Sequence, residues 1–118
     1  DTPVANPNHV EILTQGVKIW NKWRSDNRKV TANLRGIDLS GYLLDGGDFR
    51  EADLSDAILC GADLNRANLS DAKISKAELS GARLILANLS GADLTNSNLT
   101  GADLFRADLS WADLSKAT

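Results

Sequence analysis

The chain has 118 residues, 42% of them hydrophobic and 25% charged, with a formal net charge of −3 at pH 7. This length and composition indicate one small globular domain and exclude a disordered chain. No apolar run approaches the roughly 18 residues of a membrane span, and the single cysteine, Cys60, excludes an intramolecular disulfide and a clustered thiolate metal site.

The chain begins at Asp1 and contains no methionine. This start fits either the removal of a signal or transit peptide or an arbitrary boundary. We therefore expect a soluble protein, either cytoplasmic or exported and lumenal, with no membrane partner.

Residues 1–30 are predicted to form an N-terminal capping helix and a connector. Asn6 is suited to be the N-cap, and Pro7 the first helical residue. Apolar side chains then fall on one helical stripe, with Gly16 as its one weak point. The members of this stripe are Val10, Leu13, Val17 and Trp20, widened by Ile12, Ile19 and Trp23. We predict one helix over about residues 7–24, followed by a polar connector.

Residues 31–118 follow a different rule, with a large apolar residue at every fifth position. Alanine stands two residues before it without a break from Ala52 to Ala92. A helix repeats its apolar side chains every three or four residues and a strand every two, so neither carries this pattern. A fixed short period instead indicates repeat units that stack to bury their apolar side chains. The seventeen positions are Leu34, Leu39, Leu44, Phe49, Leu54, Leu59, Leu64, Leu69, Ile74, Leu79, Leu84, Leu89, Leu94, Leu99, Leu104, Leu109 and Leu114.

Several segments carry the full motif Ala-(Asp/Asn)-Leu-X-X, among them residues 52–56, 62–66, 92–96 and 102–106. This motif resembles that of the pentapeptide-repeat family, and a helix before the repeats is similar to cyanobacterial members. The resemblance implies an all-β solenoid, a right-handed quadrilateral β-helix with four pentapeptides to a coil. In this fold the centre residue and the alanine two before it point inward. Residues 31–118 would then make about four coils capped by the N-terminal α-helix, a column only ~20 Å tall at about 4.8 Å between stacked strands.

The first coil departs from the repeat in a way that suits a covered end. Ile37, Tyr42 and Gly47 stand where alanine is usual, and Phe49 stands where leucine is usual. An uncovered β-helix end exposes unpaired strand edges and the leucines of its last coil. We therefore expect the helix to cover this coil. The residues expected to do so are Val17, Trp20 and some of Ile12, Leu13 and Trp23.

Folding the chain at twenty residues places side chains in vertical columns. Gly41, Gly61, Gly81 and Gly101 would stack along one corner. In two other columns aspartates alternate with basic residues, which we interpret as a ladder of exposed ion pairs that fixes the register. Each exposed pair contributes about 0.2–1 kcal/mol. The two columns are Asp63, Arg83 and Asp103, and Asp53, Lys73, Asp93 and Asp113.

No residue pattern indicates catalysis, a cofactor or a metal site. The sole histidine, His9, lies in the first turn of the predicted helix, where we expect a solvated or capping role. Cys60 faces outward with no histidine in its coil, so nothing activates its thiol. One column of carboxylates and amides is too flat to wrap the roughly six to eight oxygens that calcium requires. This column consists of Asp48, Asn68, Asn88 and Asp108.

Four apolar side chains are predicted to face outward near the C-terminal end, where they form a partner-binding site. Ile85 and Phe105 are twenty residues apart and stack on one corner, Leu86 lies beside them, and Trp111 occupies the next corner. A cluster of this kind on a small protein favours a contact site.

The sequence favours a non-catalytic structural or protein-interaction module that presents rigid flat faces to an unidentified protein partner. The alternative is a DNA mimic that inhibits a topoisomerase or another DNA-binding protein, as some pentapeptide-repeat proteins do. Residues 31–118 carry 13 acidic and 8 basic residues, a net charge of −5, whereas a duplex ~20 Å long carries about 12 charges. This comparison disfavours the mimic, and we expect no nucleic-acid partner. An enzyme or a metal protein is the second alternative.

The last coil presents an open end in the predicted fold. Leu99, Leu104, Leu109 and Leu114 have no helix to cover them. An open strand edge with an apolar rim is complementary to a second copy of itself, so we expect a homodimer through the C-terminal coil. The rival is a monomer whose final residues fold over the opening, with Trp111 tucked inward.

Overall fold

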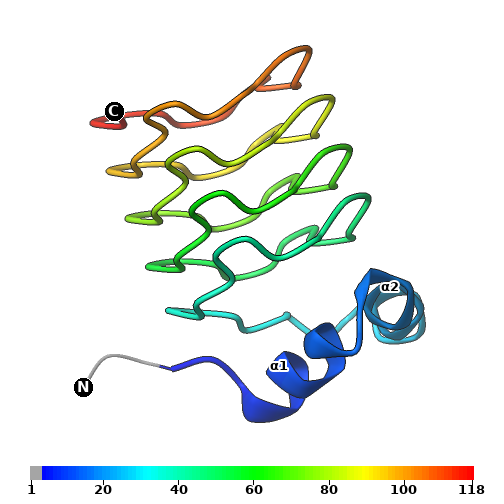
Figure 1. Ribbon diagram of the computed structural model, residues 1–118. Coiled ribbons are helices and arrows are strands. Elements are labelled where there is room, and N and C mark those ends of the chain that lie inside the picture. The colour runs from blue at the N-terminus through cyan, green and yellow to red at the C-terminus, as the bar shows by residue number, and fades with distance from the viewer. Residues whose placement is uncertain (1–3) are drawn as a thin grey trace.

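The computed structural model describes residues 4–118, which form two short helices followed by a stack of coils (Figure 1). Helix α1 spans Pro7–Thr14 and helix α2 spans Val17–Asp26. From residue 33 onward the coils contact each other through single-residue parallel β-bridges. Longer strands are absent between residues 4 and 118.

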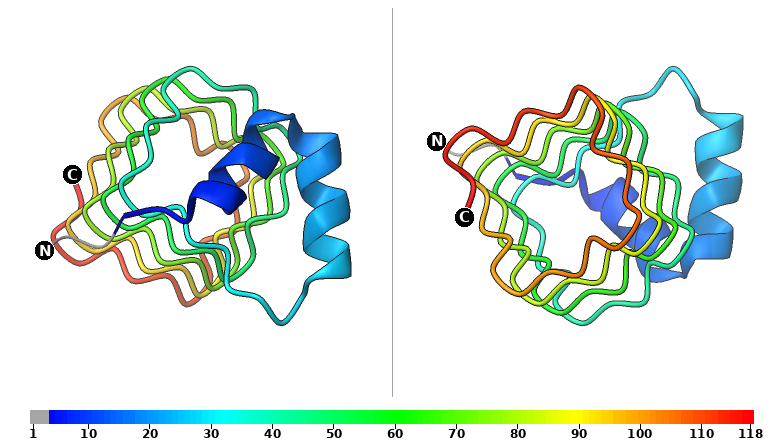
Figure 2. Two further views of the ribbon diagram at one scale, coloured as in Figure 1. Left: turned by 90° about the horizontal axis from the view of Figure 1, so that it is seen from below. Right: turned by 90° about the horizontal axis from the view of Figure 1, so that it is seen from above.

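The prediction of one helix over residues 7–24 is wrong, because the chain forms two. Asn6 begins α1 as predicted, since its Oδ1 accepts hydrogen bonds from the backbone N–H groups of Asn8 and His9. Gly16 separates the helices with a φ of 110° and a ψ of 163°, a conformation that glycine adopts readily and other residues do not. The break lets α1 cross the open end of the first coil while α2 lies along its flank (Figure 2).

Each coil is twenty residues long and turns once in every five. Asp53, for example, pairs in parallel with Asn33 in the coil before it and with Lys73 in the coil after it. The turn that follows each centre residue is closed by the backbone, as where the N–H of Ala57 donates to the carbonyl of Leu54 at 3.0 Å. The predicted twenty-residue register is therefore confirmed.

One backbone amide in each repeat has no backbone acceptor, and in most repeats a side chain takes that role. In the repeat centred on Leu54, the N–H groups of Leu54 and Asp56 donate to the next coil and that of Ala57 closes the turn. The N–H of Ser55 instead donates to Oδ1 of Asp53 at 3.1 Å. An Asp or Asn two residues before the donor accepts the same bond in repeats along the whole stack. The other donors are the N–H groups of Arg35, Ser40, Arg50, Asn65, Ser70, Ser90, Thr95, Thr100, Phe105, Ser110 and Ser115.

The aspartates of the two predicted charge columns, such as Asp63 and Asp113, accept hydrogen bonds from their own turns. The predicted ladder of exposed ion pairs between stacked residues is therefore wrong. Asp63 accepts the N–H of Asn65 at 3.0 Å, and Arg83 makes no ion pair with any described residue. Hydrogen bonds from the hydroxyl and the N–H of Ser115 hold the pKa of Asp113 below its usual value. The ion pairs of the repeats join Arg35 to Asp53 and Asp56, Arg50 to Asp48, and Arg66 to Asp45.

The interior is filled by the centre residues and by the alanines two before them, as predicted. Centre side chains from Leu34 to Leu94 are at most 2% exposed, and the alanines from Ala52 to Ala92 are at most 1% exposed. Where the alanine series is interrupted, Ser97 is also buried, and its hydroxyl donates to the carbonyl of Leu94 at 2.7 Å. The inside and outside positions of the repeat therefore have the predicted phase.

The helices contact the first coil through Leu13 and Trp20, which are both buried. Trp20 stacks on Phe49 with ring centroids 5.7 Å apart, and its indole N–H donates to the carbonyl of Asp48 at 2.8 Å. A Cβ at Gly47 would lie 2.4 Å from the Phe49 ring. The ring thus occupies the space that alanine fills in other repeats. The other helix residues predicted to cover this coil, Ile12, Val17 and Trp23, are partly buried against the core. Ile19, which was predicted only to widen the helical stripe, is exposed.

Replacing Ala72 by leucine should lower the free energy of unfolding by about 1–3 kcal/mol or more, because the added methyl groups overpack a closed interior. Lys73→Leu is the matched control, since Lys73 is adjacent and exposed. Urea denaturation of both variants measures the difference. Equal losses in the two variants would show that the inside and outside positions are wrongly placed.

Replacing Asn88 by alanine should leave the N–H of Ser90 without an acceptor and cost about 0.5–1.5 kcal/mol of stability. Asn88 Oδ1 now accepts both the N–H and the hydroxyl of Ser90, at 3.0 and 2.7 Å. Glu78 precedes a centre residue in the same way, but it accepts no bond from Ser80 among the described residues. Thermal unfolding should therefore show a clear loss for Asn88→Ala and a smaller one for Glu78→Ala, and the reverse order contradicts the role given to the turn.

Candidate partner-binding surface

Ile85, Leu86 and Phe105 share one corner of the upper coils. Phe105 is 62% exposed and Leu86 is 51% exposed, whereas Ile85 is half-buried. The N–H of Ile85 donates to Oδ1 of Asn65 in the coil before it, at 2.9 Å. Trp111 lies at the following corner and is 94% exposed. The structure thus brings three of the four predicted residues together and leaves Trp111 on a neighbouring corner.

Leu86 and Trp111 occupy turn positions with left-handed backbone. Their φ angles are 61° and 62°, a region that costs a bulky residue about 1–3 kcal/mol. Glycine holds the same positions in other coils, at Gly46 below Leu86 and at Gly91 below Trp111. Large apolar side chains therefore stand at two turn tips where glycine fits with less strain.

Two arginines border Leu86 on the same corner. Arg66 lies one coil before it and Arg106 one coil after it, by the twenty-residue register. The guanidinium of Arg106 lies 5.4 Å from the centroid of the Phe105 ring, and Arg66 pairs with Asp45. The corner is therefore apolar at its centre and basic at its edges.

The last coil leaves backbone N–H groups without acceptors. In earlier coils the N–H of each centre residue donates to the next coil, but those of Leu104, Leu109 and Leu114 have no backbone acceptor within residues 4–118. Thr118 continues the coil, since its N–H donates to the coil below. The alternative in which the final residues fold inward with Trp111 is wrong, because the indole lies in solvent.

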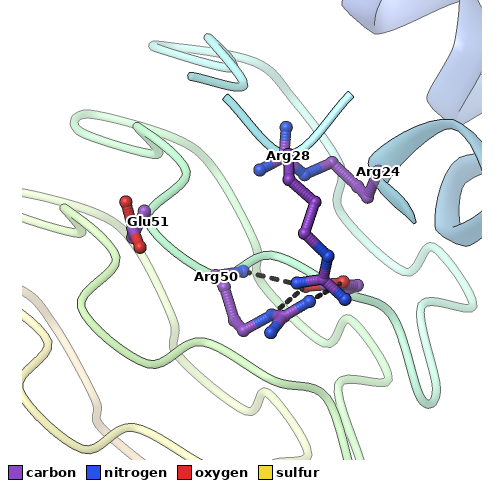
Figure 3. A pocket seen from close by; sticks show the side chains of 5 residues that line it. Arg24, Arg28, Arg50 and Glu51 are labelled. Atoms are coloured by element: carbon purple, nitrogen blue, oxygen red, sulfur yellow. Dashed lines mark hydrogen bonds and ion pairs between the residues drawn. The ribbon is translucent and has the colours of Figure 1, made fainter. Parts of the chain in front are cut away.

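A cavity of about 100 Å³ lies where α2 ends beside the first coil (Figure 3). Its lining residues are Arg24, Arg28, Asp48, Arg50 and Glu51. Arg50 binds Asp48 through Nε at 3.0 Å and Nη2 at 2.9 Å. Arg24 is buried, and its Nη1 donates to the carbonyl of Val30 at 2.7 Å. The sequence analysis did not single out these arginines.

His9 is buried in the same region, so the predicted solvated role is wrong. Its Nδ1 accepts the N–H of Asn33 at 3.0 Å, and its ring packs against Trp23 with centroids 4.8 Å apart. Burial, and after it the positive charge of Arg24, lower the pKa of His9 from its ordinary value. One coil later, the N–H of Asp53 donates to the carbonyl of Ala32 in the coil before it. No coil precedes Asn33, and its N–H donates to His9 instead.

Within residues 4–118 there is no group of three or more side chains suited to bind a metal ion. Cys60 is half-buried, and its sulfur accepts the hydroxyl of Ser80 at 3.3 Å. No helix in this part of the chain is both long and apolar enough to cross a membrane.

The repeat is also recognised by comparison with known proteins. The family model described as pentapeptide repeats matches residues 32–71, 48–84 and 82–118, in eight copies. The chain belongs to the pentapeptide-repeat family. The resemblance drawn from the Ala-(Asp/Asn)-Leu motif is therefore confirmed.

Solved structures of pentapeptide-repeat proteins from a plant and from cyanobacteria are similar to this one. A protein of the Arabidopsis thaliana thylakoid lumen is 35% identical, over 72% of this chain and 63% of that chain, with a TM-score of 0.51. One from Nostoc Pcc 7120 is 28% identical over 95% and 78% of the two chains, with a TM-score of 0.47. Rfr23 from Cyanothece 51142 is 23% identical over 83% and 96%, with a TM-score of 0.40. The chain thus spans less than two thirds of the Arabidopsis protein, and a search of curated proteins returned no match.

The free energy of unfolding should fall as the pH is lowered from 6.5, the ordinary histidine value, towards the lower pKa of folded His9. Over that window the unfolded chain takes up the proton more readily than the folded one, so protonation favours unfolding. Above it both forms are neutral and His9 contributes no slope. Denaturant unfolding at a series of pH values measures this, and His9→Gln, which cannot be protonated, should lack this part of the slope. A wild type and variant with parallel pH profiles would contradict it.

Proposed function

We propose that this pentapeptide-repeat protein is a non-catalytic interaction module that binds a protein partner through Ile85, Leu86, Phe105 and Trp111. The observation that carries the proposal is the exposure of Phe105 and Trp111, two aromatic side chains close together on the upper coils of a stack whose centre residues from Leu34 to Leu94 are buried. Exposed aromatic side chains on a small protein favour a contact surface, and aromatic residues and arginine dominate binding energy in protein interfaces.

Backbone strain supports the same surface. Leu86 and Trp111 stand in left-handed turn positions; glycine holds the position of Leu86 two coils below, at Gly46, and that of Trp111 one coil below, at Gly91. A residue placed at a strained, exposed position without gaining burial is better explained by contact with a partner than by stability of the monomer.

The chemistry of the corner limits the kind of partner. Arg66 and Arg106 border Leu86 from the coils below and above it. An apolar centre with basic edges is complementary to a surface that carries an apolar group flanked by carboxylates. We therefore infer that the partner is a protein with an acidic rim around an apolar contact.

The scaffold that presents this corner is proposed to be a right-handed quadrilateral β-helix of about four coils, closed at its N-terminal end by α1 and α2. The packing of Trp20 on Phe49 and the acceptor that His9 offers to Asn33 support the closure. A second copy of the chain is a further proposed partner, because N–H groups of the last coil lack backbone acceptors within residues 4–118 and a symmetric pair would meet through them.

DNA mimicry has less support as a function. A mimic needs a charge density close to that of a duplex, whereas residues 31–118 carry a net charge of −5 against about 12 negative charges on a duplex ~20 Å long. The basic edges of the Leu86 corner also interrupt the acidic surface. A gyrase supercoiling assay with the purified protein tests this alternative directly.

The Phe105→Ser/Trp111→Ser double variant should lose partner binding while keeping its melting temperature, because both side chains are exposed. Capture from the native lysate, followed by titration of the captured partner, should show at least about a tenfold weakening. Leu43→Ser is the matched control, since Leu43 is 79% exposed and lies outside this surface.

Sedimentation equilibrium of the same three proteins separates a heterologous partner from a second copy. A double variant that captures the partner as well as the wild type does would reject this surface. A wild type that stays monomeric at its highest soluble concentration would reject the dimer.

A further inference from the structure

Three guanidinium groups meet in the cavity between α2 and the first coil. Arg24 comes from α2, Arg28 from the connector and Arg50 from the first coil, and only Asp48 and Glu51 among the lining residues oppose their charge. Figure 3 shows the Arg28 side chain extending from the connector toward the guanidinium of Arg50. The lining therefore keeps a net positive charge in a concave, partly enclosed space.

Arg24 is a buried charge without a carboxylate partner among the described residues. Besides the bond to Val30, its guanidinium lies 5.5 Å from the centroid of the Trp23 ring, and its Nε has no hydrogen-bond partner. Buried charges in proteins are normally paired with an opposite charge. After burial, the same positive charge is the second cause that lowers the pKa of His9.

The remaining donors suit a ligand with several acceptor oxygens. Arg50 gives Nε and Nη2 to Asp48 and retains Nη1, while Arg28 makes no hydrogen bond or ion pair with the described residues through its side chain. Arg28 and Arg50 approach the cavity from separate segments. A carboxylate has two oxygens in one plane and suits a single guanidinium fork, whereas a phosphate offers oxygens in several directions.

We propose that this cavity binds a phosphate group, either as free phosphate or as a phosphate monoester. Arg28 and Arg50 donate hydrogen bonds to its oxygens, and Arg24 is a fixed positive charge in the wall. The cavity volume of about 100 Å³ is about three times the ~30 Å³ that a water molecule occupies in the liquid. The cavity therefore has room for a phosphate group. Glu51 lies on the same lining and opposes the ligand, so its charge weakens binding. The site is separate from the Leu86 corner and does not depend on it.

Titration of the full chain with inorganic phosphate, with chloride added to hold the ionic strength constant, tests the proposal. Backbone and arginine side-chain NMR signals should shift in a saturable way. Arg28→Gln should weaken binding by about tenfold or more, because it removes charged donors from an exposed residue without disturbing the fold. Lys29→Gln removes the same charge from the neighbouring residue, outside the cavity lining, and should change the affinity by less than about twofold. Glu51→Gln should strengthen binding several-fold, an outcome that a damaged fold does not produce.

His9 provides a second and independent readout because it is the only histidine in the chain. Bound phosphate offsets the charge of Arg24, so the pKa of His9 should rise on saturation. In Arg28→Gln this rise should need a correspondingly higher phosphate concentration.

Phosphoserine and acetate serve as two further test ligands. Phosphoserine distinguishes a phosphate monoester from free phosphate, and acetate distinguishes a phosphate site from a carboxylate site. Binding of phosphoserine as well as phosphate indicates a monoester, and binding of phosphate alone indicates the free ion; both support the site. Acetate that binds as tightly as phosphate overturns the assignment to phosphate. Shifts that do not saturate, or that Arg28→Gln and Lys29→Gln weaken equally, overturn the site altogether.

Discussion

The solenoid depends on a hydrogen-bonding problem that recurs at every corner. A chain that turns after each centre residue directs four of its five amide groups to backbone carbonyls and leaves one at the turn without any. The Asp or Asn before the centre residue accepts that amide from two positions away, as in Asp93 with Thr95. The short polar side chain is therefore part of the turn, and this explains why the motif places it beside the inward leucine. Where Arg83 takes that place, the amide of Ile85 uses Asn65 of the coil below instead.

The hydrogen-bond partners of the backbone groups also differ between the two ends of the stack. At the N-terminal end, residues of the helical segment supply the partners that a preceding coil would supply. His9 accepts from Asn33, Asn21 accepts the N–H of Asp48, and the indole of Trp20 donates to the Asp48 carbonyl. At the C-terminal end the amides of the last coil have no such partners within residues 4–118. Within residues 4–118 the two ends of the stack therefore differ in how their backbone amides are hydrogen-bonded.

The fold was predictable because a five-residue period leaves few solutions. Leucine at the centre and alanine two before it indicate which side chains are inside, and the twenty-residue register was implied by the resemblance to the pentapeptide-repeat family. Gly16 was identified as the weak point of the predicted helix, but a break was not predicted there, because apolar residues continue at helical spacing on both sides of it. The ladder of ion pairs failed because a sequence shows that Asp63 and Arg83 are stacked but not that the carboxylate has a nearer donor in Asn65.

The sites were predictable only where they follow from the repeat. Outward positions within the repeat identified the Leu86 corner, since phase alone determines them. His9 carried a signal that was overlooked, because it lies four residues before Leu13 on the buried face of α1. No sequence signal indicated the arginine cavity. It joins Arg24, Arg28 and Arg50, and their meeting depends on the path of the connector, which no local pattern specifies.

The register also determines how such a chain changes during evolution. A duplication of twenty residues adds one coil and moves everything above it by about 4.8 Å along the axis, without rotation. A duplication of five residues keeps the same bonds in every repeat but rotates all later side chains by a quarter turn. The corner that carries Leu86 and Phe105 would then face a different direction relative to the arginine cavity. Short insertions therefore re-aim a surface while the interior that holds the molecule together stays the same.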